Sequence, residues 1–290
     1  MSGVDRLLFE VHEQPRVLRN LLGSARSPLE ALAAEMGRRQ IAHVLIAARG
    51  TSDNAATYAK YLLGISKGLP VSLAAPSLYT LYDTPLRLCR DTLVLGVSQS
   101  GMSPDIVAVL DSARAQGVLT AAFVNAPGSR LADAAEWVIP LAAGEERSVA
   151  ATKSYTAQLM ALAMLSAALS GDEGLWQELS RVPDAVEAAL SLEETISRRA
   201  ERYRFMEHCS VISRGYNYAT ALETALKLKE LTYTGTTPYS SADFLHGPVA
   251  VVREGYPVIT IACQGRAFAS LRDFVGDMRQ RRAEEILVTD

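Results

Sequence analysis

Apolar and polar positions form alternating blocks along the chain, and these blocks predict strands that are each followed by a helix. The apolar runs that predict strands lie at 43–50, 71–76, 92–97, 119–125 and 136–141. Stretches with helical spacing follow several of them, at 51–68, at 104–116 and from about 154 onward. Strands that alternate with helices are typical of a parallel sheet covered on both faces, in which ligands bind where the strands end.

The same pattern begins again in the second half of the chain. The stretch "EHCSVISRGYNYATALETALKLKEL" (207–231) is similar to "IAHVLIAARGTSDNAATYAKYLL" (41–63), and in both an Arg-Gly pair follows the apolar run. The two pairs are about 165 residues apart, which is roughly the size of a domain. We predict an N-terminal helical segment (1–40), a first α/β subdomain with its linking helices (41–195) and a second α/β subdomain (196–290). The second ends directly after a predicted strand and is expected to be incomplete.

Composition and charge narrow the classes of function. The 290 residues are 49% hydrophobic and carry a net charge of -3 without a basic patch, which disfavours nucleic acid as a partner. Three widely spaced cysteines indicate a reducing compartment rather than a disulfide framework. The first residues lack the pattern of a secretion signal, and the most apolar run (159–169) is too short to cross a bilayer. We therefore expect a cytoplasmic protein that does not bind membranes.

Polar side chains follow two neighbouring predicted strands. In "LVLGVSQSGMSPD" (93–105) a buried run leads into four polar residues at the start of a helix, namely Ser98, Gln99, Ser100 and Ser103. Thr51 and Ser52 supply a second hydroxyl loop. A helix N-terminus offers unpaired N–H groups and partial positive charge, so it favours anions. Ordinary helix capping explains Ser103 but not the other serines. The pattern predicts a phosphate site.

Two further features carry candidate chemistry. Glu223, Lys227 and Glu230 are spaced four and three residues apart, which places them on one helical face. On spacing alone, an exposed salt-bridge ladder is the better explanation. His246 precedes Gly-Pro in a predicted turn, where a histidine is ordinarily just exposed. We find no metal-ligand spacing and no Gly-x-Gly-x-x-Gly loop, so we predict no metal and no cofactor.

Several of these motifs resemble the sugar isomerase (SIS) domain family. "SQSGMSPD" is similar to the family's phosphate loop, and "EERSVAATKSYTAQ" (145–158) to the segment after the last strand of a first SIS domain. "ALETALKLKEL" followed by "SADFLHGP" resembles the second SIS domain of glucosamine-6-phosphate synthase and its deaminase relatives. The resemblance covers nearly the whole chain. It implies an α/β fold of two doubly wound, flavodoxin-like SIS subdomains.

The resemblance also implies residues that bind the substrate, a phosphorylated amino sugar. The phosphate would be held by Ser52, Ser98, Gln99, Ser100 and Ser103. The sugar would lie near Thr51, Val149 and Ala151. Ser103 stands where the synthase usually has Thr, and Ala151 stands where Ser is common.

The same resemblance assigns catalytic roles in the second subdomain. Glu230 would move a proton between sugar carbons C1 and C2, Lys227 would orient that carboxylate, and Glu223 would hold Lys227. His246 would open the sugar ring as an acid/base, delivered across the interface of a homodimer. Each site would then be shared between two subunits.

The first residues of the sequence are relevant to whether the reaction forms or breaks down an amino sugar phosphate. The synthase carries an N-terminal glutaminase domain that begins with Cys, whereas this sequence begins with Met1 and has too few residues before His43 for such a domain. We therefore expect deamination and isomerisation of glucosamine 6-phosphate to fructose 6-phosphate and ammonia. The enzymatic alternatives are an aminotransferase-like isomerase and a fructosamine-6-phosphate deglycase. The non-enzymatic alternative is a sugar-phosphate sensor with a DNA-binding helix-turn-helix. Two SIS halves, only about 40 residues before the first predicted strand and the acidic balance disfavour it.

Overall fold

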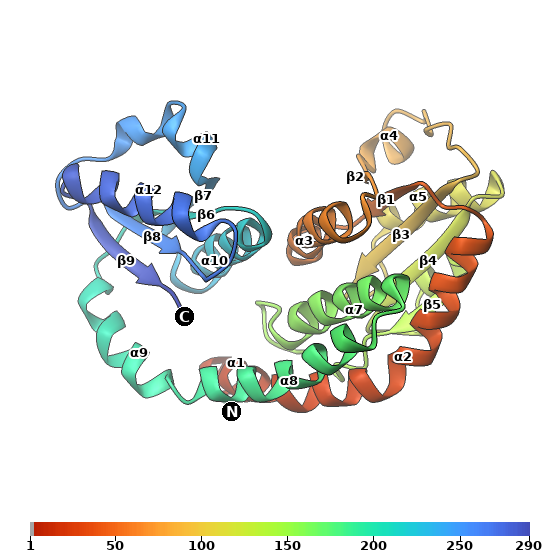
Figure 1. The fold of residues 1–290 in the computed structure, drawn as a ribbon, viewed down its shortest axis with the longest axis horizontal. Helices are drawn as coiled ribbons and strands as arrows, with labels where there is room; N and C mark the ends of the chain where they lie inside the picture. The colour runs from red at the N-terminus through yellow and green to blue at the C-terminus, as the bar shows by residue number, and fades with distance from the viewer. Residues whose placement is uncertain (1–2) are drawn as a thin grey trace. The chain divides into compact units, whose positions relative to one another are not determined.

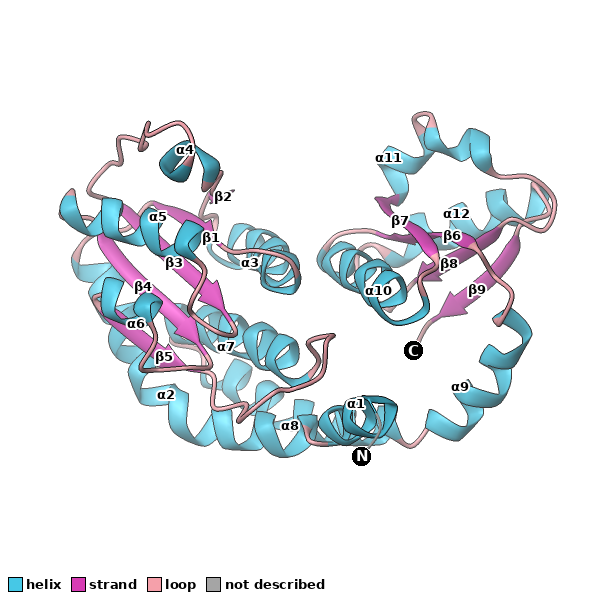
Figure 2. Cartoon of the chain, turned by 180° about the vertical axis from the view of Figure 1, so that it is seen from behind, coloured by secondary structure: helices cyan, strands magenta, loops and turns pink. Residues whose placement is uncertain are grey.

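A computed structural model describes residues 3–290, which form two compact units. The first unit ends at Leu192 and the second comprises Glu193–Asp290. Each unit contains one parallel sheet with helices on both of its faces (Figure 1 and Figure 2).

The first unit begins with two helices, α1 (Gly3–His12) and α2 (Gln14–Arg38). Its sheet contains β1 (His43–Ala47), β2 (Val71–Leu73), β3 (Thr92–Ser98), β4 (Leu119–Val124) and β5 (Trp137–Pro140). The remaining helices are α3 (Thr51–Lys67), α4 (Ser77–Thr80), α5 (Pro104–Ala115), α6 (Arg130–Ala134), α7 (Lys153–Ser170) and α8 (Glu173–Leu190). All neighbouring strands are parallel and their order is β2-β1-β3-β4-β5. This order is flavodoxin-like, which confirms the predicted fold class.

The central strands are buried on both faces, which explains their nearly unbroken apolar sequences. Every residue of β3 and β4 is buried. Because successive side chains point to opposite faces, Leu93 and Leu95 pack in the cluster with α2, α3 and α7, whereas Val94 packs with α5 and α6. The central strands are therefore enclosed by helices on both faces of the sheet.

The most apolar run of the chain lies within α7. This helix packs against α2 and α3, and its buried side chains include Met160, Leu162 and Leu165. Within residues 3–290, no helix combines the length and the apolar character needed to cross a bilayer.

The second unit is smaller and also has a parallel sheet. It contains α9 (Glu193–Ala200), η1 (Glu201–Tyr203), β6 (His208–Ser213), α10 (Tyr216–Thr232), β7 (Gly235–Ser240), α11 (Ser241–Leu245), η2 (Pro248–Val251), β8 (Pro257–Ile261), α12 (Phe268–Gln280) and β9 (Glu284–Val288). The strand order is β7-β6-β8-β9. Val211 and Ile259 pack with α10 on one face, whereas Phe244 and Phe274 pack on the other. The strand β7 was not predicted, because it is polar and contains Pro238, which an edge strand tolerates.

The repeat in the sequence corresponds to a repeated backbone conformation. Gly50 precedes α3 with φ 55° and ψ −129°, and Gly215 precedes α10 with φ 66° and ψ −134°. A positive φ at these angles favours glycine, because a side chain would strain the backbone. Both units therefore make the same junction between their first strand and the helix that follows.

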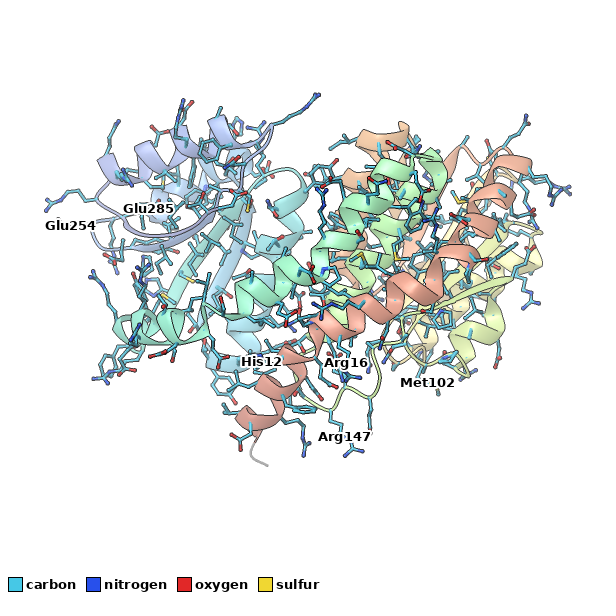
Figure 3. All side chains as sticks on the ribbon, turned by 60° about the horizontal axis from the view of Figure 1, so that its bottom comes forward. His12, Arg16, Met102, Arg147, Glu254 and Glu285 are labelled. Atoms are coloured by element: carbon cyan, nitrogen blue, oxygen red, sulfur yellow. The ribbon has the colours of Figure 1, made fainter. Side chains whose placement is uncertain are left out.

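Glu285 on β9 should destabilise the second unit at alkaline pH (Figure 3). Burial raises the pKa of Glu285 to about 7, although Thr260 Oγ1 donates a hydrogen bond to its Oε2 at 3.3 Å. The ordinary pKa of a glutamate is near 4.5. The unfolding free energy therefore falls as the pH rises from about 4.5 to about 7 and stays lower above that. We expect Glu285→Gln to raise the unfolding free energy by about 1 kcal/mol at pH 8 and to change it little at pH 4. The value at pH 8 is reduced from the full pKa shift because solvent screens a partly exposed carboxylate.

Urea unfolding followed by circular dichroism at both pH values measures this difference. Glu254→Gln is the matched control, because that carboxylate is 64% exposed in an ion pair with Arg282. An identical effect of both substitutions at pH 8 would contradict the expectation.

Candidate functional site

A cavity of about 240 Å³ lies in the first unit where β1 and β3 end, and we call it the hydroxyl pocket. Its lining comprises Arg49, Thr51, Ser52, Ser98, Gln99, Ser100, Ser103, Ile106, Ala151, Ser154 and Gln158. The strand order reverses between β1 and β3, and this is where flavodoxin-like sheets bind ligands. The structure therefore brings together the two hydroxyl loops that the sequence singled out.

The loop after β3 holds its hydroxyls so that they can donate hydrogen bonds. Ser98 Oγ accepts the Gly101 N–H at 3.0 Å, and Ser100 Oγ accepts the Met102 N–H at 3.3 Å. Each hydroxyl thereby uses a lone pair within the loop and keeps its own hydrogen for another acceptor. Ser103 occupies the N-cap position of α5, but its side chain makes no capping hydrogen bond. Three hydroxyls are thus available to an acceptor-rich ligand such as phosphate.

Glycine at position 101 is required by the tight course of this loop. Gly101 has φ 64°, and a Cβ atom there would lie 2.0 Å from Ser129 Oγ and 2.8 Å from Val124 Cγ2. Any other residue would push the loop away from β4. The sharp turn is what directs the chain from the buried β3 into the first turn of α5.

Gln158 on α7 orients the second hydroxyl loop, and the sequence did not reveal this role. Its Nε2 donates to Ser52 Oγ at 3.0 Å, and the Gln158 side chain is fully buried. Its Oε1 has no hydrogen-bond partner among the described residues. Because Ser52 accepts from Gln158, its hydroxyl hydrogen can be donated elsewhere. The one signal in the sequence is that the SIS-like segment 145–158 ends at this residue.

The lining also contains one guanidinium that the sequence analysis did not include. Arg49 Nη2 donates to Asp105 Oδ2 at 2.6 Å, and Thr80 Oγ1 donates to Asp105 Oδ1 at 2.9 Å. The hydrogen bond from Arg49, with that from Thr80, holds the pKa of Asp105 below its usual value. Arg49 is about half exposed, with its side chain 52% accessible. Neutral donors, one cation and the N-terminus of α5 together favour an anionic ligand.

Of the three residues expected near the sugar, Thr51 lies in the lining of the hydroxyl pocket, and the other two differ in their positions. Ala151 lines the hydroxyl pocket, directly before α7. Val149 lies on the same loop but is 93% exposed and is not part of the pocket lining. Of these two residues, the structure places only Ala151 beside the hydroxyl loops.

The charged face on α10 is partly buried, unlike a solvated salt-bridge ladder. Lys227 Nζ lies 2.6 Å from Glu230 Oε2 and 3.3 Å from Glu223 Oε1. The side chain of Glu223 is 7% exposed, that of Lys227 19% and that of Glu230 32%. Lys227 is therefore held between two carboxylates, and Glu230 is the more accessible of the two. An accessible carboxylate beside a fixed ammonium can transfer a proton to and from a bound molecule.

His246 follows α11 in a turn, as expected from its Gly-Pro neighbours. Its backbone N–H donates to Asp243 O at 3.2 Å, and the residue is exposed. Gly247 has φ 154° and begins the short helix η2 with Pro248. The residue is therefore accessible to solvent, as expected for a histidine in a turn.

Metal-ligating side chains do not gather in the part of the chain that the structure describes. Residues 3–290 contain no group of three or more His, Cys, Asp or Glu side chains that could hold a metal ion. The expected absence of a cofactor stays a prediction.

The comparisons with known proteins agree with the fold. The SIS domain profile matches residues 39–168 and 206–290. The glutamine–fructose-6-phosphate aminotransferase (isomerizing) of Aquifex aeolicus (strain VF5) is 34% identical over 283 residues, which cover 97% of this chain and 47% of that protein. The chain thus spans about half the length of the curated relatives it matches.

Two solved structures are similar over nearly the whole chain. A candidate phosphosugar isomerase from Silicibacter pomeroyi DSS-3 has a TM-score of 0.91 at 36% identity, covering 97% of this chain and 85% of that one. The C-terminal domain of glucosamine-fructose-6-phosphate aminotransferase from Francisella tularensis has a TM-score of 0.87 at 28% identity, covering 98% and 83%. With two doubly wound sheets and both halves matched by one profile, the chain belongs to the SIS domain family.

Proposed function

We propose that the chain is an amino-sugar-phosphate deaminase and aldose–ketose isomerase, which converts glucosamine 6-phosphate and water to fructose 6-phosphate and ammonia. The observation that carries this proposal is the hydroxyl pocket, whose donors suit a phosphate group. The partly buried Glu–Lys–Glu face of α10 supplies the groups for proton transfer. We expect the protein to act in the cytoplasm.

In the first unit, the phosphate would be bound by hydroxyl hydrogens and backbone N–H groups. Ser98, Ser100 and Ser52 already use a lone pair on an internal donor, so each can donate to a phosphate oxygen. Ser103 and Gln99 complete the set around the start of α5. Such preorganised donors lower the cost of removing water from a dianion.

In the second unit, the proposed chemistry is a proton transfer next to a carbonyl. His246 assists ring opening, which produces an aldehyde at C1 and leaves the amine on C2. Glu230 removes the proton from C2 as the C1 oxygen gains a proton, which gives an enolamine. The carboxyl proton of Glu230 exchanges with solvent before Glu230 protonates C1, and the amine loses a proton as C2 becomes an imine. Water then adds to C2 and ammonia leaves, so the ketone oxygen of fructose 6-phosphate comes from water. Lys227 keeps the Glu230 carboxylate in place through its 2.6 Å contact.

The decisive experiment is incubation of the protein with glucosamine 6-phosphate in D₂O. We expect ammonia and fructose 6-phosphate in equal amounts, with deuterium at C1 of the product. Glucosamine without phosphate is the control for the hydroxyl pocket. Binding of the sugar phosphate without ammonia would favour the sensor. Release of glucose 6-phosphate and the free amine from an N-substituted fructosamine 6-phosphate would favour the deglycase.

We also propose a homodimer with shared sites, as the family resemblance implies for His246. A mixture of Glu230→Gln chains and His246→Ala chains should then regain up to about a quarter of the wild-type activity, because some shared sites would contain neither substitution. Sedimentation at the assay concentration is the matching measurement. An active wild-type monomer would rule out the shared site.

A further inference from the structure

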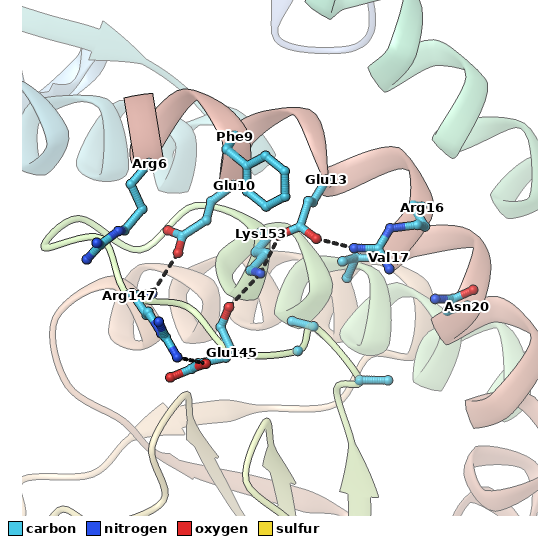
Figure 4. A pocket seen from close by; sticks show the side chains of 13 residues that line it. Arg6, Phe9, Glu10, Glu13, Arg16, Val17, Asn20, Glu145, Arg147 and Lys153 are labelled. Atoms are coloured by element: carbon cyan, nitrogen blue, oxygen red, sulfur yellow. Dashed lines mark hydrogen bonds and ion pairs between the residues drawn. The ribbon is translucent and has the colours of Figure 1, made fainter. Parts of the chain in front are cut away.

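The loop that leads from β5 to α7 is held by charged residues of the two N-terminal helices. This loop, residues 141–152, carries Ala151 into the hydroxyl pocket. Between the loop and the helices α1 and α2 lies a cavity of about 550 Å³, around which the holding residues gather (Figure 4). The contacts on its two sides hold the loop before and after Ala151.

Glu10 on α1 binds the middle of the loop directly. Its Oε1 accepts the Arg147 N–H at 2.6 Å and its Oε2 accepts the Ser148 N–H at 3.1 Å. The residue is only 4% exposed. Burial opposes ionisation of Glu10, but these hydrogen bonds and the charge of Lys153 leave its pKa below the usual value. Glu10 is therefore a carboxylate at neutral pH, and both of its oxygens are used to hold backbone.

Lys153 ties the end of the loop to the junction of the same two helices. Its Nζ lies 2.6 Å from Glu13 Oε2 and donates to Glu145 O at 2.7 Å (Figure 4). The Lys153 side chain is 3% exposed, and a buried ammonium is stable only when it is paired. The first turn of α7 thereby stays next to Glu13.

Glu146 closes the loop on itself at the start of α7. Its Oε1 accepts the Thr152 N–H at 2.8 Å and the Ser154 N–H at 3.2 Å. A carboxylate at this position also compensates the partial positive charge of the helix N-terminus. The three residues between Ser148 and Thr152 are thus fixed at both ends, and the last of them is Ala151.

From these contacts we propose that Glu10 is a positioning residue for the sugar-phosphate site, which acts through the backbone of Arg147 and Ser148 to set residues 149–151 against the sugar. This inference rests on the proposed function of the hydroxyl pocket. Under this proposal the helix α1 supports the binding site through Glu10, although α1 contributes no residue to the lining of the hydroxyl pocket.

Binding measurements on Glu10→Gln separate this role from the phosphate contacts. Glutamine keeps the shape of the side chain but turns one acceptor into a donor that faces a backbone N–H. We expect the affinity for glucosamine 6-phosphate to fall by roughly tenfold. Inorganic phosphate, which the loop after β3 is proposed to hold, should bind within about twofold of wild type. That result would show that the pocket is intact. Glu30→Gln on α2 is the matched control, because Glu30 is 46% exposed in an ion pair with Arg26.

Trypsin provides a second readout that reports the loop itself. Arg147 is 62% exposed, so the bond after it is accessible once its backbone leaves Glu10 (Figure 3). In Glu10→Ala, cleavage after Arg147 should be at least about fivefold faster, whereas cleavage after Arg181 on α8, which is 73% exposed, should keep its rate. Mass spectrometry identifies each cleaved bond.

The outcomes distinguish the inference from the function on which it rests. If wild type fails to bind glucosamine 6-phosphate, the proposed function and the inference both fall. If wild type binds it and Glu10→Gln binds it equally well, or if cleavage after Arg147 does not accelerate, the inference alone is overturned. Weaker sugar-phosphate binding with retained phosphate binding and faster cleavage supports it.

Discussion

Replacing Glu230 with glutamine should lower the turnover of glucosamine 6-phosphate by about 10²–10⁴-fold while substrate still binds. Glutamine occupies the same volume, and its amide oxygen can still accept from Lys227, which lies 2.6 Å from Glu230 Oε2. It cannot take a proton from C2 of the sugar. The substitution therefore removes the proposed base without removing its surroundings.

Release of ammonia and deuterium at C1 measure this loss, and calorimetry with the substrate measures binding. Glu254→Gln, an exposed carboxylate of the same unit, is the control for a loss of charge. Wild-type turnover in Glu230→Gln would exclude this residue from the mechanism, whichever sugar phosphate is the substrate. A parallel loss of binding would instead indicate that Glu230 only holds the ligand.

The combined substitution Ser98→Ala and Ser100→Ala should weaken the binding of glucosamine 6-phosphate by about 10²–10⁴-fold. Each hydroxyl that donates to a charged phosphate contributes roughly 1.5–3 kcal/mol, before any compensation by backbone donors. Each also accepts an N–H of its own loop, so the double variant leaves Gly101 and Met102 without those partners. Both consequences weaken the same site.

Calorimetry with glucosamine 6-phosphate and with inorganic phosphate tests this expectation. Ser112→Ala on α5 is the matched control, because Ser112 lies outside the pocket lining. Both ligands should lose affinity in the double variant, since both present the same oxygens to the loop. Unchanged affinity for both would show that the hydroxyl pocket is not a phosphate site.

The sequence predicted the hydroxyl pocket well because a general rule of topology brings its loops together. Ser52 and Ser98 are 46 positions apart, but both follow strands of a parallel sheet, whose carboxyl ends share one edge. No comparable rule connects Gln158 with Ser52, or Glu10 with Arg147. Those contacts depend on how α7, α1 and α2 pack, and the spacing of residues within one helix does not contain that information.

The sequence also did not reveal how deeply the charged face of α10 is buried. The spacing placed Glu223, Lys227 and Glu230 on one face, and the structure confirms that they are in contact. It could not show that Glu223 is almost fully enclosed, since burial depends on the rest of the unit. The strand β7 was missed for a related reason. Pro238 and the threonines before it are typical of a turn, and only pairing with β6 makes them a strand.

The similar backbone conformations of Gly50 and Gly215 have a consequence for protein engineering. Both junctions place a helix after the first strand of the unit, and the strands β2-β1-β3 and β7-β6-β8 have the same local order. The loops at the next strand differ, because a serine-rich segment follows β3 whereas "ACQGRA" (262–267) follows β8. The scaffold is therefore separable from the ligand chemistry that it carries. Transplanting residues 98–103 behind β8 would place the proposed phosphate loop at the matching position of the second unit.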